Sequence, residues 1–242
     1  MSDSVKIMIM CGGRGKRLGK LTERIPKPLV EFNGQTILEV KLNRYIDEGF
    51  KDIIFCIGYK GELIKRNVEK FAKNLNIKFS DAGEEAGILK RFWMAKDHFD
   101  EMVLMTYGDT YSDLNLNNLL ETHNKGNNEA TIVAAPIRNP FGLVEFDNDN
   151  KVTYFKEKPV LNYYIGLAII NKSALDLIPP KIIELPDGKG LVSFFKILIA
   201  LEKLGVYYHS GLEITFNTQR ELKLAEKKWR NFFTAAEDNI EE

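Results

Sequence analysis

The sequence predicts an α/β fold in which a mostly parallel β-sheet is covered by helices on both faces. Short apolar runs typical of buried strands alternate with longer stretches of helical periodicity through the first 136 residues. The apolar runs lack the apolar–polar alternation of a half-exposed strand, as expected when both faces of a sheet are covered. Strands that are separated by helices connect through crossovers, which predicts parallel pairing and a Rossmann-like core.

The elements expected in this first part follow one another in a regular order. The first helix places Leu38, Leu42 and Tyr45 on one face, and the third carries Leu89, Trp93 and Met94 inward. The expected strands are Val5–Met10, Lys51–Ile57, Asn76–Ser80, Met102–Met105 and Ala130–Pro136, and the expected helices are Gln35–Glu48, Glu62–Asn74, Gly87–Phe99 and Leu116–Lys125.

The chain becomes richer in predicted β-structure after about residue 137. The turn residues 147–150 separate two short strands, Leu143–Phe146 and Val152–Lys156, which predicts a hairpin. A strand, a helix and a strand follow, over Ile165–Ile170, Ser193–Leu204 and Val206–Ser210. We therefore predict a single domain over 1–242 with three parts: 1–136, a smaller β-rich part over 137–217, and a C-terminal helix with an acidic tail over 218–242.

Composition limits the class of partner. Lys and Arg together number 34, as do Asp and Glu, so the formal net charge is zero and a general affinity for nucleic acid is not expected. Cys11 and Cys56 both follow or end apolar runs, which indicates buried reduced thiols more than a disulfide framework. With no leader pattern and no apolar run of membrane-spanning length, we expect a cytoplasmic protein without a membrane partner.

The segment Cys11–Leu29 carries the strongest functional signal. Three glycines directly follow the first predicted strand, and basic residues stand among them; the glycines are Gly12, Gly13 and Gly15, and the cations are Arg14, Lys16, Arg17 and, between two prolines, Lys27. Glycine lets backbone N–H groups turn inward, and such a nest ringed by cations suits a polyphosphate. The alternative is a glycine-rich turn with solubilising charges.

Two familiar phosphate-binding loops do not fit this segment. A dinucleotide-binding loop requires a third glycine where Leu18 stands. A P-loop requires a hydroxyl residue after Gly15-Lys16, where the chain has Arg17, and a glycine in place of Met10.

Two further charged residues follow strands and are candidates for the same site. Asp109 comes just after the apolar run Met102–Met105, at the edge where open α/β sheets bind ligands. A carboxylate near a polyphosphate requires a cation between them, so we interpret Asp109 as a Mg²⁺ ligand, with a turn-initiating Asp as the alternative. Lys158, fixed by Pro159, is a candidate to bind the phosphate of a second substrate; an exposed charged loop is its alternative.

These residues resemble the sugar-phosphate nucleotidyltransferases, the nucleoside-diphosphate-sugar pyrophosphorylases. The family's opening signature is matched by Gly13, Gly15, Arg17, Leu18, Thr22, Pro26 and Lys27, its metal-binding aspartate by Asp109, and its E-K-P loop by Glu157, Lys158 and Pro159. The resemblance covers roughly residues 5 to 225 and is strongest to the glucose-1-phosphate cytidylyltransferases, through stretches such as IPKPLVEFNGQTIL and FCIGYKGELIK.

The resemblance implies a set of residue roles. Arg17, Lys27 and Lys158 would be catalytic, with Lys27 at the α-phosphate and Lys158 on the acceptor phosphate. The nucleotide would contact Cys11, Gly12, Gly13, Arg14, Gly15, Arg17, Lys27, Gly87 and Gly108, and the acceptor would contact Gly142, Glu157, Lys158, Tyr164 and Gly166. Mg²⁺ would be held by Asp109 and Asn217, with Glu213 in reserve.

The implied reaction joins a nucleoside triphosphate, with CTP favoured, to a sugar 1-phosphate, releases pyrophosphate, and supplies a nucleotide sugar for polysaccharide biosynthesis. The chain departs from the family at Tyr164-Ile165-Gly166, where members usually have N-x-G, and at Ala86-Gly87-Ile88. Three alternatives therefore stay open: a non-sugar phosphorylated or phosphonate acceptor, a non-catalytic regulatory homologue that binds nucleotide sugars, and, disfavoured by the glycine spacing, a reductase. A homo-oligomer is also left open.

Overall fold

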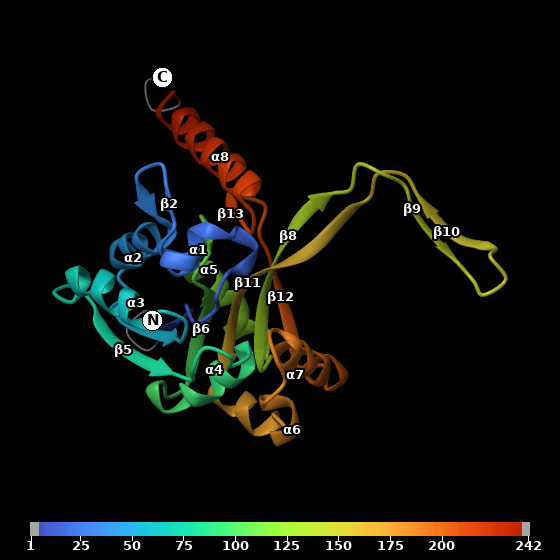
Figure 1. Cartoon of the computed structure of the whole chain (residues 1–242). Coiled ribbons are helices and arrows are strands. Elements are labelled where there is room, and N and C mark those ends of the chain that lie inside the picture. The colour runs from blue at the N-terminus through green and yellow to red at the C-terminus, as the bar shows by residue number, and fades with distance from the viewer. Residues whose placement is uncertain (1–4, 239–242) are drawn as a thin grey trace.

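The computed structural model describes residues 5–238, and their side chains as far as residue 231. A seven-stranded sheet with the order β12-β8-β11-β6-β1-β4-β5 forms the core of the fold (Figure 1). Only β11 runs antiparallel to its neighbours in this sheet, so the prediction of a mostly parallel sheet is confirmed. Its strands are β1 (Lys6–Met10), β4 (Asp52–Ile57), β5 (Asn76–Asp81), β6 (Met102–Tyr107), β8 (Ala130–Arg138), β11 (Val160–Asn171) and β12 (Leu204–Tyr208).

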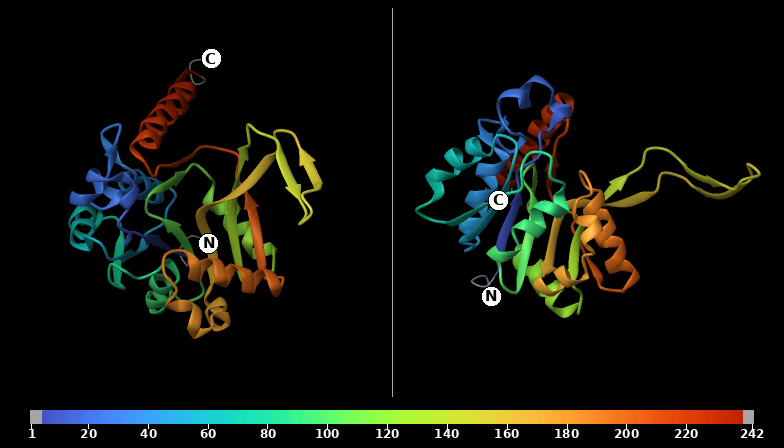
Figure 2. Two further views of the ribbon diagram at one scale, coloured as in Figure 1. Left: turned by 45° about the vertical axis from the view of Figure 1, so that its right-hand side comes forward. Right: turned by 60° about the horizontal axis from the view of Figure 1, so that its bottom comes forward.

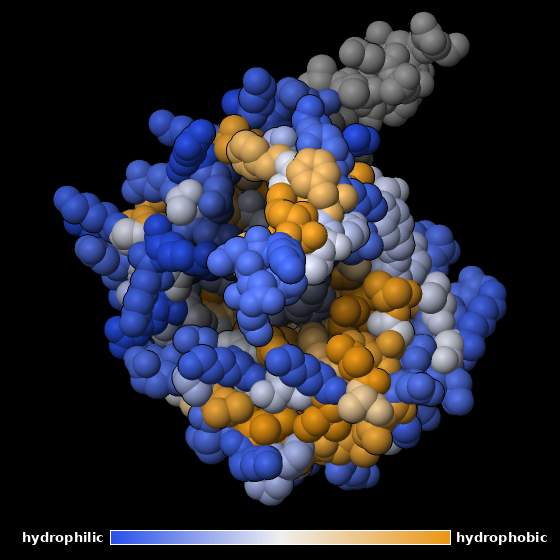
Figure 3. All heavy atoms as spheres, turned by 90° about the vertical axis from the view of Figure 1, so that its right-hand side faces the viewer, coloured by the Kyte–Doolittle hydropathy of each residue, from blue (hydrophilic) through white to orange (hydrophobic). Residues whose placement is uncertain are grey.

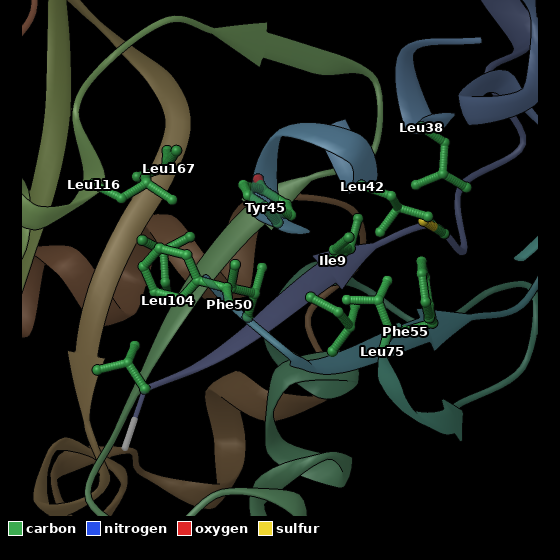
Figure 4. Packing of buried hydrophobic residues seen from close by; sticks show 14 of the residues in the cluster. Ile9, Leu38, Leu42, Tyr45, Phe50, Phe55, Leu75, Leu104, Leu116 and Leu167 are labelled. Atoms are coloured by element: carbon green, nitrogen blue, oxygen red, sulfur yellow. The ribbon is translucent and has the colours of Figure 1, made fainter. Parts of the chain in front are cut away.

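Helices cover both faces of this sheet. The helices are α1 (Lys20–Arg24), α2 (Ile37–Asp47), α3 (Gly61–Val68), α4 (Ile88–Met94), α5 (Leu116–Lys125), α6 (Pro180–Ile183), α7 (Lys189–Ala200) and α8 (Gln219–Asp238). One buried cluster joins Ile7 and Ile9 to side chains of α2, α3 and α5 (Figure 4). A second joins Met8 and Met10 to side chains of α4, α6 and α7. Because successive residues of a strand point to opposite faces, these two clusters are the two sides of the sheet.

A third cluster attaches the C-terminal helix to the domain. The ring of Trp229 in α8 lies edge-on to the rings of Phe32 and Tyr111, with centroids 5.3 and 5.1 Å away. The small sheets nearby are β2 (Glu31–Phe32) with β3 (Gln35–Thr36), and β7 (Thr110–Ser112) with β13 (Glu213–Thr215). The last residues of the expected acidic tail, 239–242, lie outside the described part of the chain.

A two-stranded arm projects from the sheet (Figures 1 and 2). Strands β8 and β11 stay paired as far as Arg138 and Val160, and the arm continues into the predicted hairpin of β9 (Leu143–Phe146) and β10 (Val152–Lys156). Several of its apolar side chains are exposed, among them Phe146, Val152 and Phe155. The face from which the arm projects carries further hydrophobic patches (Figure 3).

Some predicted boundaries are wrong. The helix expected over Ser193–Leu204 is α7, which ends four residues earlier, and the following strand is shifted with it. The helix ends because Glu202 adopts a left-handed conformation (φ 56°) while Lys203 N–H donates to Leu198 O and Glu202 N–H donates to Ile199 O. This is a Schellman motif, in which the chain leaves the helix without a glycine.

The first predicted helix starts later than expected, and the third faces differently. Gln35 and Thr36 form β3, and Thr36 then caps α2 through a reciprocal hydrogen-bond pair with Glu39. In α4, Leu89, Arg91 and Phe92 are buried, whereas Met94 is 48% exposed, so the prediction that Met94 points inward is wrong. None of the helices within residues 5–238 is long and apolar enough to cross a membrane.

Candidate active site

A pocket of about 860 Å³ opens beside the carboxyl ends of β1 and β6. Ligands of open α/β sheets bind at this edge, where loops leave the strands. Because β11 is antiparallel to β6 and places Leu167 opposite Thr106, its preceding residues lie at the same edge. The walls come from residues 10–17, 27–28, 84–86, 109–110, 163–166 and 187–188, with Ile88, Arg91, Tyr107, Glu213, Thr215 and Asn217.

The glycine-rich loop forms one wall. Gly15 has a left-handed backbone (φ 60°) and begins the short 3-10 helix Lys16–Leu18. A Cβ on Gly12 would overlap the guanidinium of Arg91, so a side chain there would displace that guanidinium. The loop and its cations Arg14, Lys16 and Arg17 all line the pocket. The structure therefore brings together the glycines and cations that the sequence singled out.

Lys27 lies at the centre of a charged cluster. It is 6% exposed, its ammonium group forms an ion pair with Asp109, and it also donates a hydrogen bond of 3.0 Å to the side-chain oxygen of Asn217. Arg17 Nη2 donates to the same Asn217 oxygen over 2.7 Å. Four predicted site residues from three distant segments thus meet at one point.

Asp109 and Asn217 also suit a hard cation. Both present an oxygen to the same Lys27 ammonium, so their oxygens lie close enough to share one positive centre. Within the part of the chain described, no group of three or more His, Cys, Asp and Glu side chains could hold a metal. Mg²⁺ typically uses one or two protein carboxylates and completes its shell with water and substrate phosphates, so this donor pair fits Mg²⁺ better than a metal that needs a full protein cage.

Arg14 connects the glycine-rich loop to the opposite wall. Its guanidinium lies 2.6 Å from Glu84 and 3.3 Å from Glu85 in ion pairs, and 5.4 Å from the centre of the Tyr59 ring. Arg14 and Lys27 are therefore both paired with carboxylates of the same chain, and an anionic ligand must exchange with these carboxylates.

Arg91 is a site residue that the sequence reasoning missed. It is 4% exposed, and its guanidinium donates to the backbone oxygens of Ile57 (2.6 Å), Gly12 (3.1 Å) and Glu84 (3.1 Å). One side chain thus joins the end of β4, the glycine-rich loop and the segment that follows β5. The available signal was that Arg91 lies one helical turn after the apolar residue Ile88, which places it near the buried face of the predicted helix.

Lys41 is a second missed residue, behind the pocket. It is buried in α2 and donates hydrogen bonds to Thr106 Oγ1 (2.8 Å) and Tyr107 O (2.6 Å), at the carboxyl end of β6. Burial lowers the pKa of Lys41 to about 7. The neighbouring Cys11 is a free, buried thiol, as expected for both cysteines, and burial raises its pKa to about 12.

The far wall of the pocket consists mainly of β11. Gly166 has a left-handed backbone (φ 77°), and a side chain there would overlap the ring of Tyr107. Tyr164 lies edge-on to that same ring, with centroids 5.9 Å apart. Tyr164 and Gly166, both predicted for the acceptor, therefore line the pocket beside the end of β6.

Five predicted residues do not line the pocket. Gly142, Glu157 and Lys158 lie on the projecting arm, where the Lys158 side chain is 69% exposed and 3.7 Å from Glu157. Gly87 and Gly108 lie behind the walls: a Cβ on Gly87 would overlap Leu185 O, and one on Gly108 would approach Cys11 Sγ to 2.8 Å. Gly87 and Gly108 thus permit close packing of the wall segments. Lys158, in contrast, is not brought to the cluster around Lys27.

Comparisons with known proteins show which family the chain resembles in sequence and in fold. The sequence model of the nucleotidyl transferase family matches residues 6–178. The chain is 28% identical to a glucose-1-phosphate cytidylyltransferase of Salmonella typhimurium, over 93% of this chain and 96% of that protein. It is 32% identical to a mannose-1-phosphate guanyltransferase of Yarrowia lipolytica, over 72% of this chain and 51% of that protein.

Solved structures share the fold. A Bacillus anthracis protein described as a glucose-1-phosphate thymidylyltransferase superposes with a TM-score of 0.73 at 17% identity, over 92% of this chain and 94% of that one. HddC from Yersinia pseudotuberculosis superposes with a TM-score of 0.66 at 21% identity, over 93% of this chain and 99% of that one.

Proposed function

We propose, because the chain belongs to the nucleotidyl transferase family, that it transfers the nucleotidyl group of CTP to a sugar 1-phosphate. The observation that carries the proposal is the cluster of Arg17, Lys27, Asp109 and Asn217 beside a glycine-rich loop. In the reaction an oxygen of the acceptor phosphate attacks the α-phosphorus, the bond from that phosphorus to the β-phosphate bridging oxygen breaks, and pyrophosphate leaves with the electron pair. Positioning and charge neutralisation are the main requirements of such a step.

The chain's own residues supply both requirements. Backbone N–H groups of the glycine-rich loop, with Arg14 and Arg17, would hold the phosphates of the triphosphate. Pro26 and Pro28 fix the backbone at Lys27, and the buried side chain, paired with Asp109, would hold its ammonium at the α-phosphate. Arg14 would exchange Glu84 for phosphate, because it is paired with that carboxylate before the nucleotide binds.

We further propose that Asp109 and Asn217 hold Mg²⁺. When bound, the ion would neutralise phosphate charge and help to orient the triphosphate. The oxygen of an amide contributes less charge than a carboxylate, so Asn217 would give a weaker site than an aspartate in the same place. Lys27 and Arg17 both donate to the Asn217 oxygen, so Mg²⁺ would exchange with these two cations when it binds.

CTP is the proposed nucleotide because the cytidylyltransferase relative matches over nearly the whole length of both chains. Lys158 is proposed to bind the acceptor phosphate after the arm bends toward the pocket. A left-handed backbone at Lys158 (φ 43°) supports a functional role, since a non-glycine residue seldom adopts this conformation without a reason.

One panel tests the proposal. The protein would be incubated with Mg²⁺, each common nucleoside triphosphate, and a set of sugar 1-phosphates and small phosphorylated or phosphonate alcohols, and pyrophosphate and product mass would be measured. We expect pyrophosphate and a nucleotide sugar with CTP. Binding of nucleotide sugars without pyrophosphate from any pair would favour a regulatory protein and overturn the proposed reaction.

A further inference from the structure

Glu213 is a buried carboxylate in the wall of the pocket. It is the first residue of β13 and is 8% exposed. Its Oε2 atom accepts a hydrogen bond of 2.9 Å from the hydroxyl of Tyr163. Its Oε1 atom is also buried but has no hydrogen-bond partner among the described residues. The carboxylate in the pocket wall therefore has one satisfied and one unsatisfied oxygen.

An unsatisfied buried oxygen of this kind requires an explanation. Most buried polar atoms in folded proteins have a partner, and leaving one without a partner is unfavourable. Lys228 does not supply that partner: its ammonium donates to the backbone oxygen of Glu213 and lies 3.9 Å from Oε2. Since Glu213 lines the pocket, a donor on a bound ligand can complete its hydrogen bonding.

The position of Glu213 separates it from the phosphate-binding cluster. Asn217 follows it by four residues and lies beyond the end of β13. Asn217 contacts Arg17 and Lys27, whereas Glu213 contacts Tyr163 in β11. The two ends of this segment therefore serve two ends of the pocket, and Glu213 is better suited to the acceptor than to a role as a reserve metal ligand.

Charge defines what this end of the pocket can bind. The residues of β11 that line the pocket are Tyr163, which contacts Glu213, and Tyr164, Ile165 and Gly166, and none of these is a cation. A carboxylate repels phosphate but accepts hydrogen bonds strongly from hydroxyl groups. The acceptor would therefore place its phosphate toward Lys27 and its hydroxyl-bearing part against Glu213.

We propose that Glu213 is a specificity-determining residue that accepts a hydrogen bond from a sugar hydroxyl of the acceptor through Oε1. This inference rests on the proposed function and names the part of the acceptor that the far wall recognises. Tyr163 acts as a positioning residue, because its hydroxyl holds Oε2 and thereby fixes the carboxylate in the pocket wall. A site built to bind a hydroxyl discriminates strongly against an analogue that lacks it.

The test compares Glu213→Ala and Glu213→Gln with wild type on the best sugar 1-phosphate and on its monodeoxy analogues. We expect Glu213→Ala to raise the acceptor KM at least tenfold while kcat and the Kd for nucleotide alone change less than threefold. For wild type, one deoxy analogue should have an acceptor KM raised by a similar factor. For Glu213→Ala, the same analogue should raise the KM little further, because the hydrogen bond is already lost, so the two effects would not multiply. Tyr163→Phe should give a smaller rise in acceptor KM, and Glu121→Ala, on an exposed face of α5, should change nothing.

The outcomes separate this inference from the reaction itself. If wild type releases no pyrophosphate with any pair, the proposed function fails. If wild type is active but Glu213→Ala raises the nucleotide Kd and leaves the acceptor KM unchanged, the assignment of Glu213 to the acceptor is wrong. The assignment would also be wrong if each deoxy analogue raised the acceptor KM by the same factor in wild type and in Glu213→Ala. Thermal denaturation of each variant identifies misfolding. If Glu213→Ala is misfolded, Glu213→Gln, which keeps the shape of the side chain, is compared with wild type in its place.

Discussion

The Lys27 ammonium lies 3.0 Å from the side-chain oxygen of Asn217, although 190 residues separate the two in the chain. This contact joins the segment after β1 to the segment after β13. Asp109, which follows β6, pairs with the same ammonium. The charged centre of the pocket therefore depends on β1 and β6 of the central sheet and on the separate pair of β7 and β13.

Replacing Lys27 should remove most of the activity. We expect Lys27→Met to lower kcat by at least a thousandfold, because a fixed charge beside the reacting phosphorus would be lost. Steady-state pyrophosphate release measures this. Lys16→Met is the matched control, since Lys16 is an exposed cation of the same loop, and it should retain kcat within about fivefold. Near-normal turnover by Lys27→Met would remove Lys27 from the catalytic residues.

Metal dependence should follow the residue at position 217. Chelation by EDTA should abolish pyrophosphate release, and added Mg²⁺ should restore it. Asn217→Asp should lower the Mg²⁺ concentration for half-maximal activity severalfold, because a carboxylate binds the ion more strongly than an amide, and Asn217→Ala should raise it. An unchanged Mg²⁺ dependence in both variants would place the metal elsewhere.

Loss of the Arg91 guanidinium should weaken nucleotide binding through the loops that it joins. Arg91→Met leaves the oxygens of Ile57, Gly12 and Glu84 without their donor. We expect a stability loss of roughly 3 kcal/mol and a nucleotide Kd raised at least tenfold, measured by denaturant unfolding and calorimetry. Arg66→Met, a substitution on α3 outside the pocket, serves as control. A stability loss without any change in Kd would assign Arg91 a purely structural role.

Stability should rise with pH above neutrality. Burial lowers the pKa of Lys41 from 10.5 to about 7, so between these values the unfolded chain binds more protons than the folded one. The free energy of unfolding should then increase by up to about 1.4 kcal/mol per pH unit. Above pH 9 the raised pKa of Cys11 acts in the opposite direction, because only the unfolded chain loses that proton.

Chemical denaturation of wild type and Lys41→Met at pH 7, 8 and 9 measures this dependence. The variant should lose the rise, whereas Lys90→Met, a control in α4, should keep it. If the free energy of unfolding changed equally with pH in all three proteins, Lys41 would stay charged in the folded state.

Lys158 on the arm gives the most direct test of arm movement. We expect Lys158→Ala to raise the acceptor KM at least tenfold, with Lys156→Ala as control because it lies on the same arm and is also exposed. Mixing Lys158→Ala with Lys27→Met adds a second measurement. Recovered activity would show that Lys158 serves the pocket of another copy, and no recovery would favour bending within one chain. An unchanged acceptor KM would exclude Lys158 from acceptor binding.

Local sequence signals predicted much of the fold and one half of the site. Helix α5 and the hairpin strands β9 and β10 have the predicted boundaries, because side-chain periodicity and turn residues determine them. The end of α7 was not predictable in this way, since Glu202 takes the left-handed position that glycine usually occupies.

Buried charged residues that join separate segments by hydrogen bonds were harder to predict. Arg91 and Lys41 are long cations whose neighbours come from other strands and loops, and a single sequence does not show which helix face those segments cover. The placement of Lys158 outside the pocket depends on how far β8 and β11 extend beyond the sheet, which is a matter of tertiary structure. The glycine-rich loop was visible because its residue types are themselves the signal.

The internal pairing of Arg14 with Glu84, and of Lys27 with Asp109, bears on how the protein responds to ionic strength. A cation that is already neutralised by a carboxylate of its own chain holds few salt ions from solution. When the triphosphate binds, it therefore displaces mainly these carboxylates and releases few salt ions. The affinity for nucleotide should therefore decline less steeply with salt than the number of cations around the pocket suggests.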